Sequence, residues 1–247
     1  MKVLVVIPAR YGSTRFPGKP LALIAGRPMI RHVHDRARLA EGVDRVIIAT
    51  DDRRIFEAVE AFGGEAIMTR TDHPSGTDRL AEAADVLGAG PDDVIVNVQG
   101  DQPVFDPRLI SQVIRPLLDD PDLEMATPII PTADPHEIQD PNHVKVVFDD
   151  RGLALYFSRA PIPWPREAGG PTAYYKHLGI YAYRAAFLRR FVALPSGRLE
   201  NIEKLEQLRA LEHGFRVRVV LTDLDSPEVD TPDDVAKVEA WLRVDPG

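Results

Sequence analysis

The chain has 247 residues, of which 44% are hydrophobic and 28% charged, as in a folded globular protein rather than a disordered one. Its formal net charge of -8 provides no broad basic surface, so nucleic acid is not an expected partner. Cysteine is absent, which excludes disulfide frameworks and thiolate metal sites and agrees with a cytoplasmic location. The apolar run at 3–7 is too short for a secretory signal or a membrane-spanning helix, so no membrane association is expected.

Short runs rich in Val and Ile alternate with amphipathic segments in the first half of the chain. This alternation is typical of an α/β protein whose mainly parallel sheet carries helices on both faces. The expected strands span 2–7, 45–49 and 93–98. The expected helices span 28–40, 52–62, 77–86 and 107–118.

The alternation loosens after about residue 124. Strands are expected at 125–130, 144–148, 178–183 and 216–221, and helices at 199–213 and 232–242. A stretch rich in Pro and Gly at 161–171 is a candidate mobile loop over a site. We expect a single domain, 1–247, with two lobes of about 1–130 and 131–247. The second lobe should be the smaller one and rich in β-structure.

The segment 8–20, P-A-R-Y-G-S-T-R-F-P-G-K-P, follows the first expected strand and so lies where open α/β sheets bind ligands. Its cationic and hydroxyl side chains suit a triphosphate, and its glycines let backbone N–H groups approach oxyanions. It is not a Walker A loop, because five residues separate Gly12 from Gly18 and Pro20 follows the lysine. A basic surface loop is the alternative interpretation.

Two acidic positions are candidate Mg²⁺ ligands. Asp101 follows the expected strand 93–98 directly, in the turn Q-G-D-Q-P, and so lies at the same sheet edge as the basic loop. Asp230 lies between an expected strand and an expected helix. Its alternative role is structural, since Thr231 and Pro232 are typical of an ordinary helix start.

Further candidates come from the second half. Glu206 stands beside an apolar stripe formed by Leu199, Ile202 and Leu205, so its carboxylate should meet a hydroxyl-rich ligand or a buried partner. The other carboxylates of that expected helix, Glu200, Glu203 and Glu212, should form a solvated face. His177 opens a strand, where a structural role is ordinary. The aromatic residues between 154 and 183 should mostly fill a core or a subunit interface.

Motifs along nearly the whole chain resemble those of the 3-deoxy-manno-octulosonate cytidylyltransferases. They are I-P-A-R-Y-G-S-T-R-F-P-G-K-P at 7–20, M-T-R-T-D-H-P-S-G-T-D-R at 68–79, N-V-Q-G-D at 97–101, V-K-V-V at 144–147, A-L-Y-F-S-R-A-P-I-P-W at 154–164, H-L-G-I-Y-A-Y-R at 177–184, L-E-Q-L-R at 205–209 and V-D-T-P at 229–232. The resemblance implies a Rossmann-like nucleotide-diphospho-sugar transferase fold, with nucleotide binding in the first lobe and sugar binding and dimerisation in the second.

The same resemblance implies that CTP and the sugar acid give CMP-sugar and pyrophosphate with Mg²⁺, for lipopolysaccharide-type biosynthesis, in a cytoplasmic homodimer. The implied nucleotide-binding residues are Ala9, Arg10, Ser13, Arg15, Lys19, Arg70, Ser75, Gly76 and Arg79. The implied sugar contacts are Gln99, Arg159, His177, Tyr181 and Glu206, with Arg159 matching the sugar carboxylate in charge. The implied metal pair is Asp101 and Asp230, which share catalysis with Lys19 and Arg10.

One position departs from the family pattern. Members commonly have Gly-Asp-Glu-Pro where this chain has Gly-Asp-Gln-Pro at 100–103, so Gln102 replaces a carboxylate beside the expected metal site. The replacement leaves open whether a related sugar acid is the acceptor. A nucleotidyltransferase for a sugar 1-phosphate and a catalytically silent nucleotide-binding protein are the other interpretations, and retention of Lys19, Asp101 and Asp230 argues against the silent one.

Overall fold

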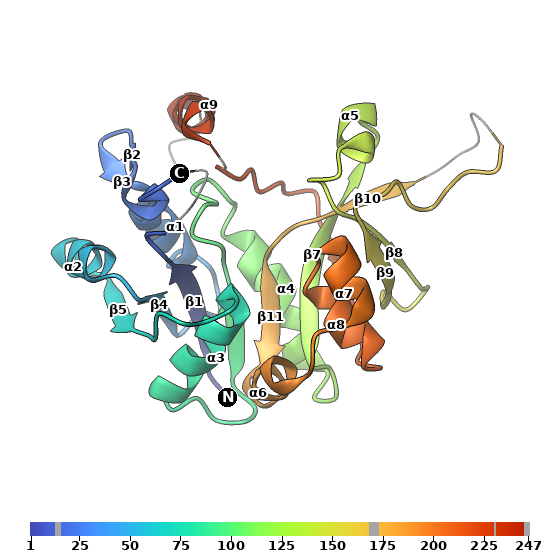
Figure 1. Ribbon diagram of the computed structural model, residues 1–247, viewed down its shortest axis with the longest axis horizontal. Helices are drawn as coiled ribbons and strands as arrows, with labels where there is room; N and C mark the ends of the chain where they lie inside the picture. The colour runs from blue at the N-terminus through green and yellow to red at the C-terminus, as the bar shows by residue number, and fades with distance from the viewer. Residues whose placement is uncertain (13–15, 168–172, 230, 245–247) are drawn as a thin grey trace.

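The structure, a computed structural model, describes residues 1–12, 16–167, 173–229 and 231–244. Within these ranges the main sheet has the strand order β5-β4-β1-β6-β11-β7-β10-β8-β9, with β12 paired to β7. Figure 1 shows β4 and β5 at one side of the molecule and β8 and β9 at the other. The parallel half comprises β1 (Val3–Ala9), β4 (Arg45–Thr50), β5 (Glu65–Met68) and β6 (Val94–Asn97). The predicted parallel β-α-β arrangement is confirmed for this half.

The remaining strands introduce antiparallel pairing. They are β7 (Met125–Thr132), β8 (Lys145–Phe148), β9 (Ala154–Ser158), β10 (Tyr174–His177), β11 (Tyr181–Arg184) and β12 (Arg218–Leu221). β11 pairs antiparallel with both β6 and β7, so one sheet continues from the first half of the chain into the second. A separate two-stranded hairpin joins β2 (Leu23–Ile24) and β3 (Arg27–Pro28). The division into two lobes stays a prediction.

Helices cover both faces of the sheet, as the sequence predicts. The longer ones are α1 (Met29–Ala37), α2 (Arg53–Ala61), α3 (Gly76–Val86), α4 (Arg108–Asp119), α6 (Ala185–Ala193) and α9 (Pro232–Val244). Alternate side chains of β1 enter two cores: Leu4 and Val6 pack with residues of α3 and α6, whereas Val5 and Ile7 pack with residues of α1, α2 and α4. None of the described helices is long and apolar enough to cross a membrane.

The predicted helix at 199–213 is wrong in its continuity. The structure has α7 (Arg198–Glu203) and α8 (Gln207–Glu212), separated at Lys204, whose φ of 54° is left-handed. The predicted inward stripe is wrong as well, because Ile202 is 67% exposed. Because α7 ends at this break, its last carbonyl groups have no N–H partner within the helix and can accept hydrogen bonds from other donors.

The predicted solvated face of that helix is wrong for Glu200, whose side chain is only 12% exposed, but right for Glu212, which is exposed. Glu200 pairs with Arg209 at 2.6 Å, Glu203 accepts hydrogen bonds from Ser158 Oγ at 2.7 Å and Arg159 N at 3.0 Å, and Glu212 accepts one from Leu199 N at 2.9 Å. Glu212 accepts from an N–H group that the start of α7 leaves unbonded, whereas Glu203 binds groups at the end of β9 and Glu200 binds an arginine of α8.

Two smaller predictions have mixed outcomes. The predicted strand at 178–183 begins only at Tyr181, since β10 ends at His177 and a short connection through Gly179 intervenes. Of the Pro- and Gly-rich stretch, 168–171 lies outside the described residues, and 161–167 contains no helix or strand. Helix α5 (Pro135–Gln139) and the short 3₁₀ turn η1 (Lys19–Leu21) complete the described elements.

Candidate active site

A cavity of about 300 Å³ lies at the carboxyl ends of β1 and β6. Eight of the predicted residues line it: Ala9, Arg10, Lys19, Ser75, Gly76, Arg79, Gln99 and Asp101. The strand ends converge here because β1 and β6 are parallel neighbours, which is where ligands bind in open α/β sheets. Ser13 and Arg15 lie outside the described residues.

The amino end of α3 forms one wall of this cavity. Ser75 Oγ accepts hydrogen bonds from Thr77 N at 3.1 Å and Asp78 N at 3.2 Å, so Ser75 caps the helix. A Cβ at Gly76 would lie 3.7 Å from Pro8, which shows how closely α3 approaches the end of β1. The cap and the close approach direct the positive end of the helix dipole toward the cavity.

The two predicted arginines of this region lie in different settings. Arg79 is buried, donates to Asp51 Oδ2 at 2.9 Å and also donates to Thr69 Oγ1. Arg70 is exposed, with its Nε 3.5 Å from an oxygen of Asp72, and it does not line the cavity in the described residues. Arg79 therefore fixes the cavity wall, whereas nucleotide binding by Arg70 stays a prediction.

Lys19 and Asp101 form the charged centre of the site. Lys19 Nζ lies 2.6 Å from Asp101 Oδ2 and donates to Val229 O at 2.9 Å. Val229 N donates to Asp101 O at 2.9 Å, so the segment before residue 230 lies against the Asp101 turn. Asp230 itself lies outside the described residues. Within the part of the chain that is described, no three His, Asp or Glu side chains gather as a metal site.

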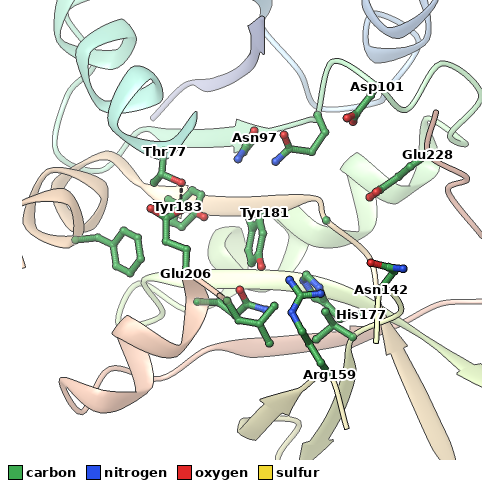
Figure 2. A pocket seen from close by; sticks show the side chains of 16 residues that line it. Thr77, Asn97, Asp101, Asn142, Arg159, His177, Tyr181, Tyr183, Glu206 and Glu228 are labelled. Carbon is green, nitrogen blue, oxygen red and sulfur yellow. Dashed lines mark hydrogen bonds between the residues drawn. The ribbon is translucent and has the colours of Figure 1, made fainter. Parts of the chain in front are cut away.

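A larger cavity of about 430 Å³ adjoins the first and shares Gln99 and Asp101 with it. All five predicted sugar contacts line it, and Figure 2 shows the side chains of Arg159, His177, Tyr181 and Glu206 around it. The lining also includes residues that the sequence analysis did not single out, namely Thr77, Asn97, Asn142, Gly179, Tyr183, Gln207 and Glu228.

Arg159 is anchored by backbone carbonyl groups at the edge of the larger cavity. Its guanidinium donates to Glu203 O at 2.6 Å, Pro141 O at 2.8 Å and Lys204 O at 3.3 Å. The left-handed Lys204 and the end of α7 present two of these acceptors. Three of its five N–H groups are used in these bonds, so the charge is held in place while donors remain for a ligand carboxylate.

His177 is a neutral residue of the cavity wall. Burial lowers the pKa of His177 to about 3. Its Nε2 lies 2.9 Å from Thr127 Oγ1, and that hydroxyl lies 2.8 Å from Ile180 O. Because the hydroxyl donates to a carbonyl, we assign the ring proton to Nε2, which leaves Nδ1 as an acceptor.

Glu206 and Tyr181 both line the larger cavity. Glu206 accepts a hydrogen bond from Thr77 Oγ1 and lies 3.5 Å from Arg209, and burial raises the pKa of its carboxyl. Burial, with the charges of Glu206 and Glu228, also raises the pKa of the Tyr181 hydroxyl. Tyr181 therefore stays a protonated donor beside an acceptor carboxylate.

Some of the missed residues had a usable signal. Asn97 ends β6 and stands two positions before Gln99, the spacing at which strand residues share one face. Gln207 follows Glu206 directly in the sequence, and the structure buries it to 5% exposure. Asn142 and Glu228 carry no local signal, because long-range packing brings them here.

The comparisons with known proteins agree with this geometry. A family model described as cytidylyltransferase matches residues 4–219. A 3-deoxy-manno-octulosonate cytidylyltransferase of Syntrophus aciditrophicus is 58% identical over 98% of this chain and 97% of its own length. The chain belongs to the 3-deoxy-manno-octulosonate cytidylyltransferase family.

Two further relatives refine the placement of this cytidylyltransferase. The structure of CMP:2-keto-3-deoxy-manno-octonic acid synthetase complexed with CTP superposes with a TM-score of 0.93 at 46% identity, covering 99% of both chains. An 8-amino-3,8-dideoxy-manno-octulosonate cytidylyltransferase of Shewanella frigidimarina is 54% identical over 99% of this chain and 100% of its own length. The predicted family and fold are thus both confirmed.

Proposed function

We propose that this cytidylyltransferase transfers CMP from CTP to 3-deoxy-manno-octulosonate, giving the CMP-sugar and pyrophosphate. The observation that carries the proposal is the junction of two cavities at Gln99 and Asp101. A nucleotide in the smaller cavity and a sugar acid in the larger one meet there, beside the Lys19 ammonium. The Syntrophus relative is named for this acceptor, and the CTP complex is of a synthetase for the same kind of product.

The arrangement supports direct transfer. The anomeric hydroxyl of the sugar forms a bond to the α-phosphorus of CTP and releases its proton to solvent, while the bond to the bridging oxygen of pyrophosphate breaks, so no covalent enzyme intermediate is needed. Lys19 and Arg10, both at the smaller cavity, supply positive charge to the departing phosphates. Arg159 holds the sugar carboxylate, and neutral His177 and protonated Tyr181 contact its hydroxyls.

We also propose Mg²⁺ as the metal, held by Asp101 and Asp230. The donor type fits, because Mg²⁺ commonly takes one or two protein carboxylates together with phosphate oxygens, and Asp101 is a partly exposed carboxylate at the junction of the cavities. When bound, Mg²⁺ stabilises charge on the phosphates and lowers the pKa of a coordinated hydroxyl. Loss of pyrophosphate release on removal of Mg²⁺ by a chelator, with recovery on its return, is the expected result.

A grid of four nucleoside triphosphates against several sugar acids and sugar 1-phosphates tests the reaction, with pyrophosphate release as the readout. We expect turnover with CTP and 3-deoxy-manno-octulosonate. Turnover with sugar 1-phosphates and not with sugar acids would contradict the proposal and support the other nucleotidyltransferase class.

A second acceptor has a specific observation in its favour. The larger cavity is lined by three carboxylates, Asp101, Glu206 and Glu228, against the single guanidinium of Arg159. Such a lining also suits the ammonium group of the 8-amino sugar for which the Shewanella relative is named. A competition assay with both sugars at equal concentration identifies the preferred acceptor from the CMP-sugar formed.

Homodimer formation, a cytoplasmic location and a role in lipopolysaccharide-type biosynthesis remain proposals. The aromatic stretch from 154 to 183 is where we expect the subunit contact. Sedimentation equilibrium of the purified chain should give twice the monomer mass of 27.4 kDa. A monomer at micromolar concentration would contradict the dimer.

A further inference from the structure

Gln102 and Glu228 form a polar pair at the edge of the larger cavity, and the proposed mechanism uses neither. Gln102 Nε2 donates a hydrogen bond to Glu228 Oε1 at 3.2 Å. Because an ionised carboxylate only accepts, this contact decides which end of the Gln102 amide faces Glu228. Gln102 is fully buried directly after Asp101, whereas Glu228 is exposed to the cavity.

The surrounding backbone holds this pair in place. Val229 N donates to Asp101 O at 2.9 Å, so the residues next to both partners are tied together. A Cβ at Gly179 would lie 3.5 Å from Glu228 Oε1 and 3.7 Å from Gln102 Nε2. The Glu228 carboxylate therefore has a defined place against the connection between β10 and β11.

Glu228 lies where two spaces meet. With Asn142 and His177, Glu228 lines the 430 Å³ cavity called the larger cavity above. The same three residues also line a third cavity, of about 650 Å³, which is bordered by residues of β10 and α9. In Figure 2, Glu228 and Asp101 lie on one side of the larger cavity and Glu206 lies on the other. The charge of Glu228 reaches the cavity interior, since it contributes to the raised pKa of Tyr181.

The charges of the lining act on the orientation of a bound sugar acid. Such a ligand carries one carboxylate and several hydroxyl groups. Glu228 repels a carboxylate on its side of the cavity, whereas Arg159 attracts one. Sugar hydroxyls, in contrast, donate strong hydrogen bonds to a carboxylate. The negative charge of Glu228 thus favours a sugar whose carboxylate faces Arg159 over one whose carboxylate faces Glu228.

We propose that Glu228 accepts hydrogen bonds from the sugar hydroxyls and sets the orientation of the sugar acid, with Gln102 as its positioning residue. The inference rests on the function proposed for the same cavity. A glutamate at position 102 would set a second carboxylate against Glu228 Oε1, where the Gln102 amide now donates. The neutral amide that departs from the family pattern is therefore the partner that Glu228 requires.

Steady-state kinetics of Glu228→Gln, Gln102→Glu and the double variant test the proposal. We expect Glu228→Gln to raise KM for the sugar acid about tenfold, the effect of losing one charge-assisted hydrogen bond, and to leave KM for CTP within about twofold. Gln102→Glu should raise the same KM by a similar factor. Glu41→Gln, an exposed carboxylate away from both cavities, is the control that should change neither KM.

The double variant separates positioning from an independent role. If Gln102 acts through Glu228, adding Gln102→Glu to Glu228→Gln should change KM for the sugar acid by less than about twofold. Multiplied effects, an unchanged sugar KM in Glu228→Gln, or an equal rise in KM for CTP would overturn the inference. If Gln102→Glu lacks cooperative melting, Gln102→Met replaces it, removing the donor without adding charge. A wild-type protein inactive with every sugar acid would refute the proposed function instead.

Discussion

The two cavities that meet at Gln99 and Asp101 are built in different ways. The smaller one uses the ends of β1 and β6 and the start of α3, all within the first 101 residues, and its wall carries Lys19, Arg10 and a helix amino end. The larger one collects side chains from distant segments as far as Glu228, and its wall carries three carboxylates and one guanidinium among amide, aromatic and apolar side chains. The first arrangement suits phosphates and the second a polyol with one carboxylate. Substitutions should therefore affect the two substrates separately, except where the cavities meet.

Asp101→Ala should have the largest effect, because Asp101 lies at the junction and serves both cavities. We expect turnover to fall by about 10²- to 10³-fold, the usual effect of removing one group that stabilises transition-state charge. The melting temperature should change little, since the side chain is 26% exposed and fills no core. Pyrophosphate release at saturating CTP measures the effect.

The matched control is Asp122→Ala, an exposed aspartate in the turn before β7, which should retain full activity. Near-normal pyrophosphate release by Asp101→Ala would show that the junction does not carry the chemistry, and the distinction between the cavities would lose its central point.

Arg159→Ala should come next and should affect only the sugar. Loss of the guanidinium removes the proposed partner of the sugar carboxylate, which should cost about 2–3 kcal/mol and raise KM for the sugar acid on the order of 50-fold. KM for CTP should stay within about twofold. Arg159→Lys should be intermediate, because an ammonium keeps the charge but cannot reach all three carbonyl acceptors. Equal changes in both KM values would refute the separation of the cavities.

The same contrast explains what the sequence could predict. Gln99 and Asp101 come shortly after the end of β6, and Lys19 lies in the crossover that follows β1. In parallel β-α-β units these strand ends meet at one edge whatever the rest of the fold does. Most of the smaller cavity was therefore predictable from local order. Gln102 was noticed as a departure, but its partner Glu228 is 126 positions away, and nothing in the local sequence links them.

Glu206 lies at the larger cavity, although the helical spacing that suggested its inward position is not what the structure has. Helical spacing from 199 to 213 suggested an inward stripe, yet the helix breaks at Lys204 and Ile202 is 67% exposed. No Gly or Pro marks this break in the sequence. Arg159 binds the carbonyl groups of Glu203 and Lys204, so tertiary hydrogen bonds offset the local preference for a continuous helix. Glu206 reaches the cavity because of the break.

Ser75→Ala should have a small effect confined to the nucleotide side. Loss of the cap of α3 should cost about 1 kcal/mol of unfolding free energy and raise KM for CTP by a few-fold, with KM for the sugar acid unchanged. Asp52→Ala is a matched control, because Asp52 caps α2 through Arg54 N at 2.9 Å and lines neither cavity. The control should lose similar stability in urea unfolding without a change in KM. A rise in KM for CTP in both variants would assign the effect to stability alone.

His177 gives the smallest effect and tests whether the sugar side uses a neutral histidine. Since burial lowers its pKa to about 3 from 6.5, the unfolded chain takes up a proton on this residue at a higher pH than the folded chain. Its contribution to stability is therefore fully present above about pH 6.5 and decreases as the pH falls toward 3, by at most about 1.4 kcal/mol per pH unit.

His177→Gln keeps a donor for Thr127 and cannot titrate, so the difference in unfolding free energy between wild type and variant should slope between pH 6.5 and 5, where carboxylates contribute little. In the wild type, the pH profile of kcat should show no inflection from this residue above pH 5. A flat difference would mean that His177 has the same pKa folded and unfolded, and the ring would then be a candidate proton acceptor for the attacking hydroxyl rather than a fixed hydrogen-bonding group of the cavity wall.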